Sequence, residues 1–127
     1  MNNGARIESF TDLNAWKQAH RLVLLIYKLT KHFPREELYS LVDQLRRAAI
    51  SIVSNIAEGF SRESYKEKVQ FYSTARGSTT EVQSQLLIAK DLGDISQTDF
   101  DEIAKLTIVV HKLLSGLIKS SKLKYQK

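Results

Sequence analysis

The chain has 127 residues, a formal net charge of +5 and no cysteine. This length fits one domain whose core is stable without disulfides or metals, and the lack of cysteine excludes a disulfide scaffold and thiolate metal sites. No stretch has the apolar length of a signal peptide or a membrane span, so we expect a cytoplasmic protein that contacts no membrane.

The N-terminal third of the sequence predicts an arm and one helix. Residues 1–10 show no periodicity, and we expect a flexible arm there. A first helix is predicted from an N-cap at Asp12 to about His32, because apolar residues recur at spacings of three and four. Pro34 ends it, and the short link that follows predicts an antiparallel neighbour.

The second predicted helix covers residues 36–59 and has an apolar arc of roughly 200° on the helical wheel. We expect it to be the central helix, with more apolar surface than its three companions cover, and this predicts association between copies of the chain. Gly59 is expected to end the helix in the left-handed conformation. The arc consists of Leu38, Leu41, Leu45, Ala48, Ala49, Ile52, Val53, Ile56, Ala57 and Phe60.

Two further helices follow. Ser64 and Glu67 have the spacing of a capping box, so the third helix is predicted to begin directly after the serine. It ends at Gly93. A fourth helix begins after Ser96 or Thr98 and runs to about residue 120, again with apolar residues at spacings of three and four.

No run of residues alternates with the period of two that a strand requires. The predicted fold class is therefore all-α, an up-down-up-down antiparallel four-helix bundle. We assign residues 11–121 to the bundle and residues 122–127 to a basic C-terminal tail.

The sequence contains no recognisable catalytic or metal-binding pattern. The three histidines lie on different helices or at a helix end, without the glutamate spacing that carboxylate bundles use to hold metals. A glycine-rich phosphate loop, a nucleophile elbow and a Cys–His pair are also absent. We therefore predict a protein that is not an enzyme and that has no metal site and no cofactor.

A polar ladder follows one side of the second predicted helix. Its members are Arg47, Ser51, Asn55, Glu58 and Arg62. Under one interpretation they form a solvated stripe with weak ion pairs inside the helix. Under another they form a hydrogen-bonded network across a seam, because asparagine is a poor helix former. A third interpretation is a ligand or nucleic-acid site.

Two other residues break the local pattern. Arg46 lies inside the apolar arc, so its guanidinium must extend to the rim or meet a carboxylate from another helix or another copy; we expect the carboxylate. Gly77 lies within the third helix, where glycine costs about 1 kcal/mol relative to alanine. Close approach by another backbone or by a ligand would explain this glycine, and simple tolerance is the alternative.

Short motifs between residues 11 and 118 form a specific combination. They are Asp12-Leu13 with Trp16, Phe33-Pro34, the run QLRRAA at 44–49, SNIAEG at 54–59, and ARGS at 75–78 with Glu81. This combination resembles the bacterial four-helix bundle proteins named after the intervening sequences of 23S ribosomal RNA. The resemblance covers most of the chain.

The resemblance implies a bundle that assembles into rings, typically pentamers, and it does not imply an enzyme. It also implies kinship with the accessory proteins of diversity-generating retroelements, which are basic bundles that bind nucleic acid and a reverse transcriptase. We therefore predict a homo-oligomer that binds RNA or DNA through its basic surface. A protein–protein adaptor without nucleic-acid binding, or a small-molecule-binding protein, is the alternative.

The predicted site residues form two sets. The signature residues carried over from the resemblance are Arg46, Arg47, Asn55, Glu58, Arg76 and Glu81, and with Ser51, Arg62 and Gly77 they make up the predicted polar interface network. The nucleic-acid candidates are Arg47, Arg62, Lys119, Lys122 and Lys124.

Overall fold

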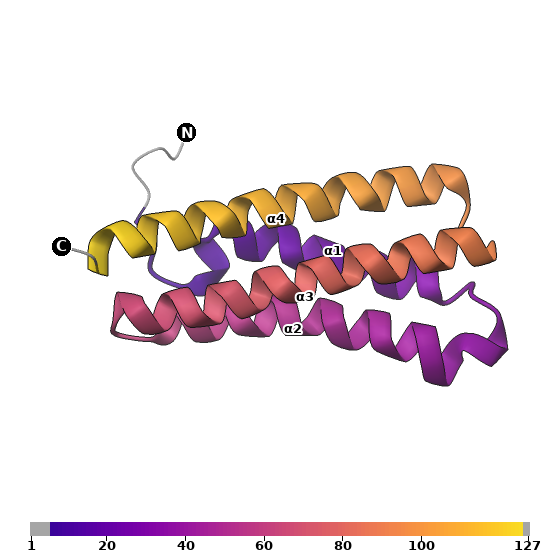
Figure 1. Cartoon of the computed structure of the whole chain (residues 1–127), viewed down its shortest axis with the longest axis horizontal. Helices are drawn as coiled ribbons and strands as arrows, with labels where there is room; N and C mark the ends of the chain where they lie inside the picture. The colour runs from indigo at the N-terminus through magenta and orange to yellow at the C-terminus, as the bar shows by residue number, and fades with distance from the viewer. Residues whose placement is uncertain (1–5, 126–127) are drawn as a thin grey trace.

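The computed structural model describes residues 6–125, which form an elongated bundle of four helices (Figure 1). The helices are α1 (Asn14–Thr30), α2 (Asp43–Ser61), α3 (Tyr65–Leu92) and α4 (Gln97–Tyr125). α2 packs against α1 and α3, and α4 packs against α3 and α1. The described residues contain no strand, and this confirms the predicted all-α bundle with antiparallel neighbours. None of the helices is long and apolar enough to cross a membrane.

The start of α1 differs from the prediction. A short turn, η1 (Phe10–Asp12), precedes the helix, and its N-cap is Ser9, whose hydroxyl accepts the N–H of Thr11 at 3.2 Å. The Asp12 carboxylate accepts the N–H groups of Glu8 at 2.9 Å and Ser9 at 3.0 Å. These two bonds lower the pKa of Asp12. Asp12 therefore closes a capping box for η1 and is not the N-cap of α1. The first five residues of the predicted arm lie outside the described part.

The link between α1 and α2 is longer than expected. After Pro34 the chain forms the turn η2 (Arg35–Glu37) and one wide π-helical turn, η3 (Leu38–Val42), before α2 begins. The regular helix thus starts at residue 43 instead of 36. Its end was also predicted wrongly, because Gly59 is helical and α2 continues to Ser61.

The predicted limits of α3 are correct, and α4 extends further than predicted. The Ser64 hydroxyl accepts the N–H of Glu67 at 3.1 Å, and Gly93 ends α3 in the left-handed conformation with a φ of 80°. At the start of α4, the Ser96 hydroxyl accepts the N–H of Asp99 at 3.1 Å. α4 does not end near residue 120, so the first part of the predicted basic tail continues this helix.

All four helices contribute to one continuous core. Its largest fully buried apolar side chains are Leu22 and Ile26 of α1, Leu45, Ile52 and Ile56 of α2, Val82 of α3, and Ile103, Val110 and Leu114 of α4. Because these side chains lie on one side of each helix, the core follows the long axis of the bundle.

The predicted arc of α2 is mostly covered within the chain, contrary to our expectation. Its neighbours α1 and α3 cover it from two sides, and the buried members are Leu41, Leu45, Ala48, Ala49, Ile52 and Ile56. Most of the large exposed apolar side chains lie on α3 and α4 instead, and they include Leu87, Ile88, Leu92, Ile108, Val109 and Leu123. The arc is wide because α2 lies between two partners.

Candidate functional site

Basic side chains gather at the end of the bundle where α2 meets α3 and where α4 ends. This is also the end at which both chain termini lie (Figure 1). Three of the cations here lie over aromatic rings, an arrangement that holds each charge in place at the surface. The pairs are Arg62 over Phe71 at 4.6 Å, Lys68 over Phe60 at 5.5 Å and Lys124 over Tyr65 at 5.1 Å from the ring centroid.

Lys68 shows that like charges are close together at this end. Its ammonium donates to the carbonyl oxygens of Phe60 at 2.7 Å and Gly59 at 3.2 Å in the last turn of α2, and the Gly59 carbonyl also accepts the N–H of Arg62 at 3.3 Å. Burial lowers the pKa of Lys68, and the positive charge of Lys124 lowers it further. An anion bound near these two lysines would relieve their repulsion.

A cation-lined hollow of about 380 Å³ lies on the seam between α3 and α4 near the same end. Its lining residues are Arg76, Ser115, Ile118, Lys119, Lys122 and Leu123, with no carboxylate among them. Arg76 is oriented by a hydrogen bond from its guanidinium to the Ser115 hydroxyl at 3.2 Å. Three cations over an alkyl floor form a surface that suits phosphate oxygens.

The predicted nucleic-acid candidates therefore divide into groups. Lys119 and Lys122 share the basic hollow, and Lys124 lies close by at the end of α4. Arg62 is at the same end but pairs with Glu58 at 3.0 Å. Arg47 is near the opposite end of α2 and pairs with Asp43 at 3.2 Å, so it does not join the others.

The polar ladder of α2 has a half-buried centre and exposed ends. At the centre, the hydroxyls of Ser51 and Ser78 share a hydrogen bond of 2.8 Å across the α2–α3 seam. The Asn55 amide donates to the Ser51 carbonyl at 2.8 Å and to its hydroxyl at 3.1 Å. The ends are the exposed ion pairs of Arg47 and Arg62 described above. The network interpretation thus describes the centre of the ladder, and the solvated stripe describes its ends.

Arg46 meets a hydroxyl and an aromatic ring, and the expected carboxylate is missing among the described residues. Its Nε donates to Thr30 Oγ1 at 3.0 Å, and its guanidinium lies 4.5 Å above the centre of the Tyr27 ring. The Thr30 hydroxyl donates in turn to the Ile26 carbonyl at 2.7 Å, which leaves its oxygen free to accept. The guanidinium is only partly buried, so water can solvate the rest of it.

Gly77 is exposed on α3, and a Cβ atom added there would have no neighbouring atom within 4 Å. Gly116 of α4 is in the same situation. Close approach within the chain therefore does not explain Gly77. Among helical glycines, the close contact occurs at Gly59, where an added Cβ would lie 2.7 Å from the ring of Tyr72.

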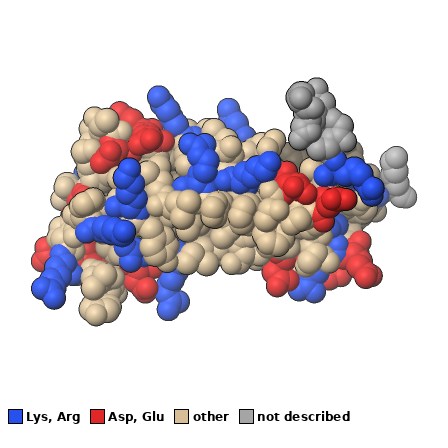
Figure 2. All heavy atoms as spheres, turned by 180° about the vertical axis from the view of Figure 1, so that it is seen from behind, with Lys and Arg blue, Asp and Glu red and all other residues tan. Residues whose placement is uncertain are grey.

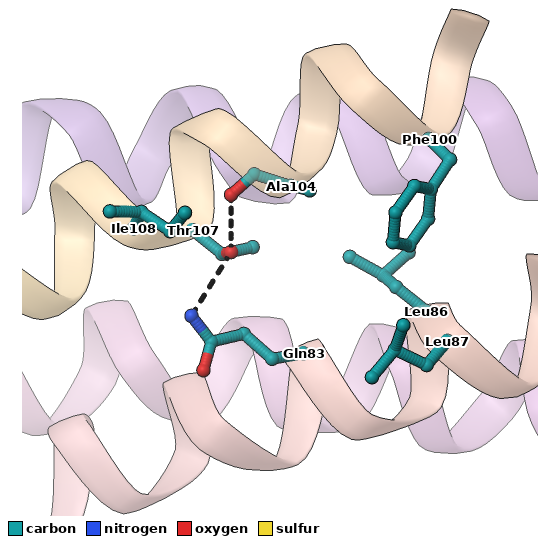
Figure 3. Close-up of a pocket in the computed structure, with 7 residues that line it drawn as sticks. All are labelled: Gln83, Leu86, Leu87, Phe100, Ala104, Thr107 and Ile108. Carbon is teal, nitrogen blue, oxygen red and sulfur yellow. Dashed lines mark hydrogen bonds between the residues drawn. The ribbon is translucent and has the colours of Figure 1, made fainter. Parts of the chain in front are cut away.

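A second, apolar hollow of about 280 Å³ lies on the α3–α4 seam. Figure 3 shows its lining residues: Gln83, Leu86 and Leu87 of α3 with Phe100, Ala104, Thr107 and Ile108 of α4. Gln83 donates to the Thr107 hydroxyl at 3.2 Å, and that hydroxyl donates to the Ala104 carbonyl at 2.7 Å. These bonds leave the apolar side chains as the main contact surface.

Asp94 lies close to other acidic side chains at the end of the bundle opposite the basic hollow. Burial raises the pKa of Asp94, and the negative charges of Glu37 and Glu36 raise it further. The Oδ2 atom of Asp94 is buried without a hydrogen-bond partner among residues 6–125. On the face seen from behind, acidic groups lie towards both ends and basic groups are spread along the bundle (Figure 2).

Asp94→Asn is expected to stabilise the protein at pH 7 by some tenths of a kcal/mol. An acid whose pKa is raised by folding favours the folded state only while protonated, so its contribution is lost as pH rises through the folded pKa. The gain, measured by urea unfolding, should disappear below the ordinary pKa of 3.8. Asp91→Asn, on the exposed side of α3, is the control. A less stable D94N protein at pH 7 would contradict the prediction.

The described residues include no group of three histidine, aspartate or glutamate side chains placed to hold a metal ion.

One buried polar residue, Gln85, was not identified from the sequence. It lies three residues after Val82 and four before Ala89, and this spacing could have identified it as a buried amide.

Comparison with known proteins gives a family and a related fold. Residues 11–116 match the family described as 23S rRNA-intervening sequence protein. A crystal structure of a protein of unknown function from the S23 ribosomal protein family of Bacteroides thetaiotaomicron has the same fold, with a TM-score of 0.77 at 21% identity. The similarity covers 83% of this chain and 95% of that one. No curated protein matches the sequence.

The matched region runs from η1 into the second half of α4, so it includes parts of all four helices and every signature residue. This extent agrees with the motifs RRAA and SNIAEG on α2 and ARGS on α3. The chain therefore belongs to the 23S rRNA-intervening sequence protein family.

Proposed function

We propose that the protein is a self-associating bundle that binds the phosphate backbone of RNA or DNA and has no catalytic activity. The observation that carries this proposal is the hollow lined by Arg76, Lys119 and Lys122, in which three cations meet no carboxylate. Backbone binding needs such a surface and does not require base-specific contacts. Lys68 and Lys124 extend the positive surface beside it.

Self-association would place several copies of this hollow on one particle. Each chain carries a formal charge of +5, and multivalent contact strengthens binding without any new contact within a chain. The pentamer implied by the family resemblance is the arrangement that we favour.

The K119A/K122A double variant is expected to bind a generic RNA or DNA at least tenfold more weakly than the wild type. The slope of log affinity against log salt should fall by about 1 for each lysine that contacts a phosphate. Fluorescence anisotropy titrations at several salt concentrations measure both quantities.

The matched control is K28A/K31A, which removes two charges near the far end of α1. Equal weakening in this control would show that only net charge matters. Wild-type binding that is absent at low salt, or that does not change with salt, would contradict the proposal.

The outer surface of α3 and α4 is the proposed contact between copies. Leu87 is 48% exposed and Ile108 is 49% exposed, and they lie at the apolar hollow of Figure 3. Gly77 and Gly116 leave open space on the same two helices, which permits close approach by another backbone. The free energy falls when a second copy covers apolar surface of this kind and removes it from water.

The L87E/I108E variant is therefore expected to be monomeric at micromolar concentration, where the wild type is an oligomer. Light scattering measures the mass of both proteins. Ile50→Glu, at an exposed position on α2, should leave the mass unchanged. A monomeric wild type, or loss of assembly in I50E alone, would overturn this assignment.

A protein–protein adaptor is the second candidate function, and the apolar hollow favours it. A side chain of a partner, such as a reverse transcriptase, would fill the space beside Leu87 and Phe100. This candidate gains support if the wild type is monomeric and binds no nucleic acid at low salt.

A further inference from the structure

A polar hollow of about 260 Å³ lies on the seam between α2 and α3, apart from both hollows of the α3–α4 seam. Its lining residues are Gln44, Arg47, Ala48 and Ser51 of α2 with Glu81 and Gln85 of α3. The volume is many times the roughly 30 Å³ that one water molecule occupies, so an organic group with several heavy atoms fits.

Gln85 is the most unusual residue of this hollow. Only 9% of its surface is exposed, and its Oε1 atom is buried with no hydrogen-bond partner among residues 6–125. A buried acceptor in this state is costly, because it has lost its bonds to water and gained none in return. Gln85 lines the hollow, so a turn of its side-chain amide would present this acceptor to a donor from outside the chain.

The charges around the hollow favour a cation. Glu81 lies one helical turn before Gln85, is exposed, and forms no ion pair within the described part of the chain. The charge of Arg47 is balanced in part by Asp43, which its Nε contacts at 3.2 Å in an exposed ion pair. Counting Asp43 and Glu81 as −1 each and Arg47 as +1, the surroundings have a formal charge of −1.

We propose that this hollow binds a small organic cation through a primary ammonium group. An ammonium group has three N–H donors and no acceptor, so it can bond to the Glu81 carboxylate and to Gln85 Oε1 at once. Gln44 and Arg47 are exposed side chains that line the hollow together with Gln85. The alkyl part of the ligand lies against the methyl group of Ala48.

Calorimetric titration of the full chain with 1,4-diaminobutane tests the proposal. The control ligand is 1,4-bis(trimethylammonio)butane at equal ionic strength, because it carries the same two positive charges but has no N–H donor. We expect saturable binding of the diamine and none of the control. Equal binding of both ions, or no saturable binding at tens of millimolar, would overturn the proposal.

Two variants are expected to shift the affinity in opposite directions. Glu81→Gln removes the charge and should weaken diamine binding at least tenfold, whereas Asp91→Asn on the same helix should leave it unchanged. Arg47→Ala removes a competing cation and should strengthen binding. Weaker diamine binding to R47A would show that Arg47 contributes to the site instead of competing with the ligand, and it would refute the proposal.

A third variant separates binding from folding. Gln85→Leu fills the same space without the unpaired acceptor, so the free protein should melt at a higher temperature and lose the diamine-induced rise in Tm. A Q85L protein that still binds the diamine like the wild type would contradict the role of this amide.

The ammonium could come from a free amine or from a lysine side chain of another protein. N-acetyl-lysine amide distinguishes these sources, because tighter binding of this compound than of the diamine indicates a lysine, and weaker binding indicates a free diamine. Both results support the site. If neither compound binds, the proposal is refuted. The K119A/K122A variant, altered on the other seam, should bind the diamine normally.

Discussion

Ile52→Ala is expected to lower the free energy of unfolding by about 2–5 kcal/mol, the usual range for truncating a fully buried aliphatic side chain. Ile52 lies in the middle of α2, is 0% exposed and belongs to the continuous core. The substitution removes apolar contacts and leaves a cavity that the flanking helices cannot collapse to fill.

Ile50→Ala provides the control for this prediction. Ile50 is on the same helix, two residues away, but is 42% exposed. Its replacement should change the stability of the monomer by less than about 0.5 kcal/mol. Urea unfolding at constant m-value measures both changes. Similar losses in the two variants would show that α2 is rotated relative to the structure described above.

Gly59→Ala is expected to lower the free energy of unfolding by about 1–3 kcal/mol through overpacking. An added Cβ would lie 2.7 Å from Tyr72 Cε1, 2.9 Å from Tyr72 Cδ1 and 3.0 Å from Phe71 Cβ. Tyr72 is buried and Phe71 Cβ is fixed to the backbone, so neither can move cheaply. The stability lost through overpacking exceeds the gain of about 1 kcal/mol that alanine has over glycine in helix propensity.

Gly77→Ala is the matched control, because this glycine is also helical but has open space around it. Alanine there should raise the free energy of unfolding by about 0.5–1 kcal/mol. Thermal unfolding of the two variants compares them directly. A stabilised G59A protein would contradict the close packing of α2 on α3. A G77A protein that is stabilised but no longer assembles would support a contact between copies at α3.

These two glycines show that the sequence does not predict which helical glycine is closely packed. The sequence predicts that Gly59 ends a helix, and it leaves close approach and simple tolerance open as explanations for Gly77. In the structure, Gly59 has the close neighbour and Gly77 has none within the chain. Helical periodicity gives the direction in which each residue faces, but the distance to the facing helix depends on the side chains of that helix.

The structure brings together only some of the predicted site residues, because the others lie on faces or helices that packing keeps apart. Residues spaced along one helix share a face by geometry, and this places Lys119 with Lys122. Their third partner, Arg76, comes from another helix and was predicted for a different role. Likewise, Arg46 was expected to meet a carboxylate, and only the packing of α1 on α2 shows that Tyr27 and Thr30 meet it.

The sequence by itself determined the number of helices, their antiparallel order, the limits of α3 and the family, because periodicity, capping residues and short motifs are local properties of the chain. The tertiary structure alone decided which cations share a hollow, which amide is buried without a partner, and which helices keep apolar side chains exposed. Those features depend on contacts between residues far apart in sequence, and such contacts exist only after the four helices have packed.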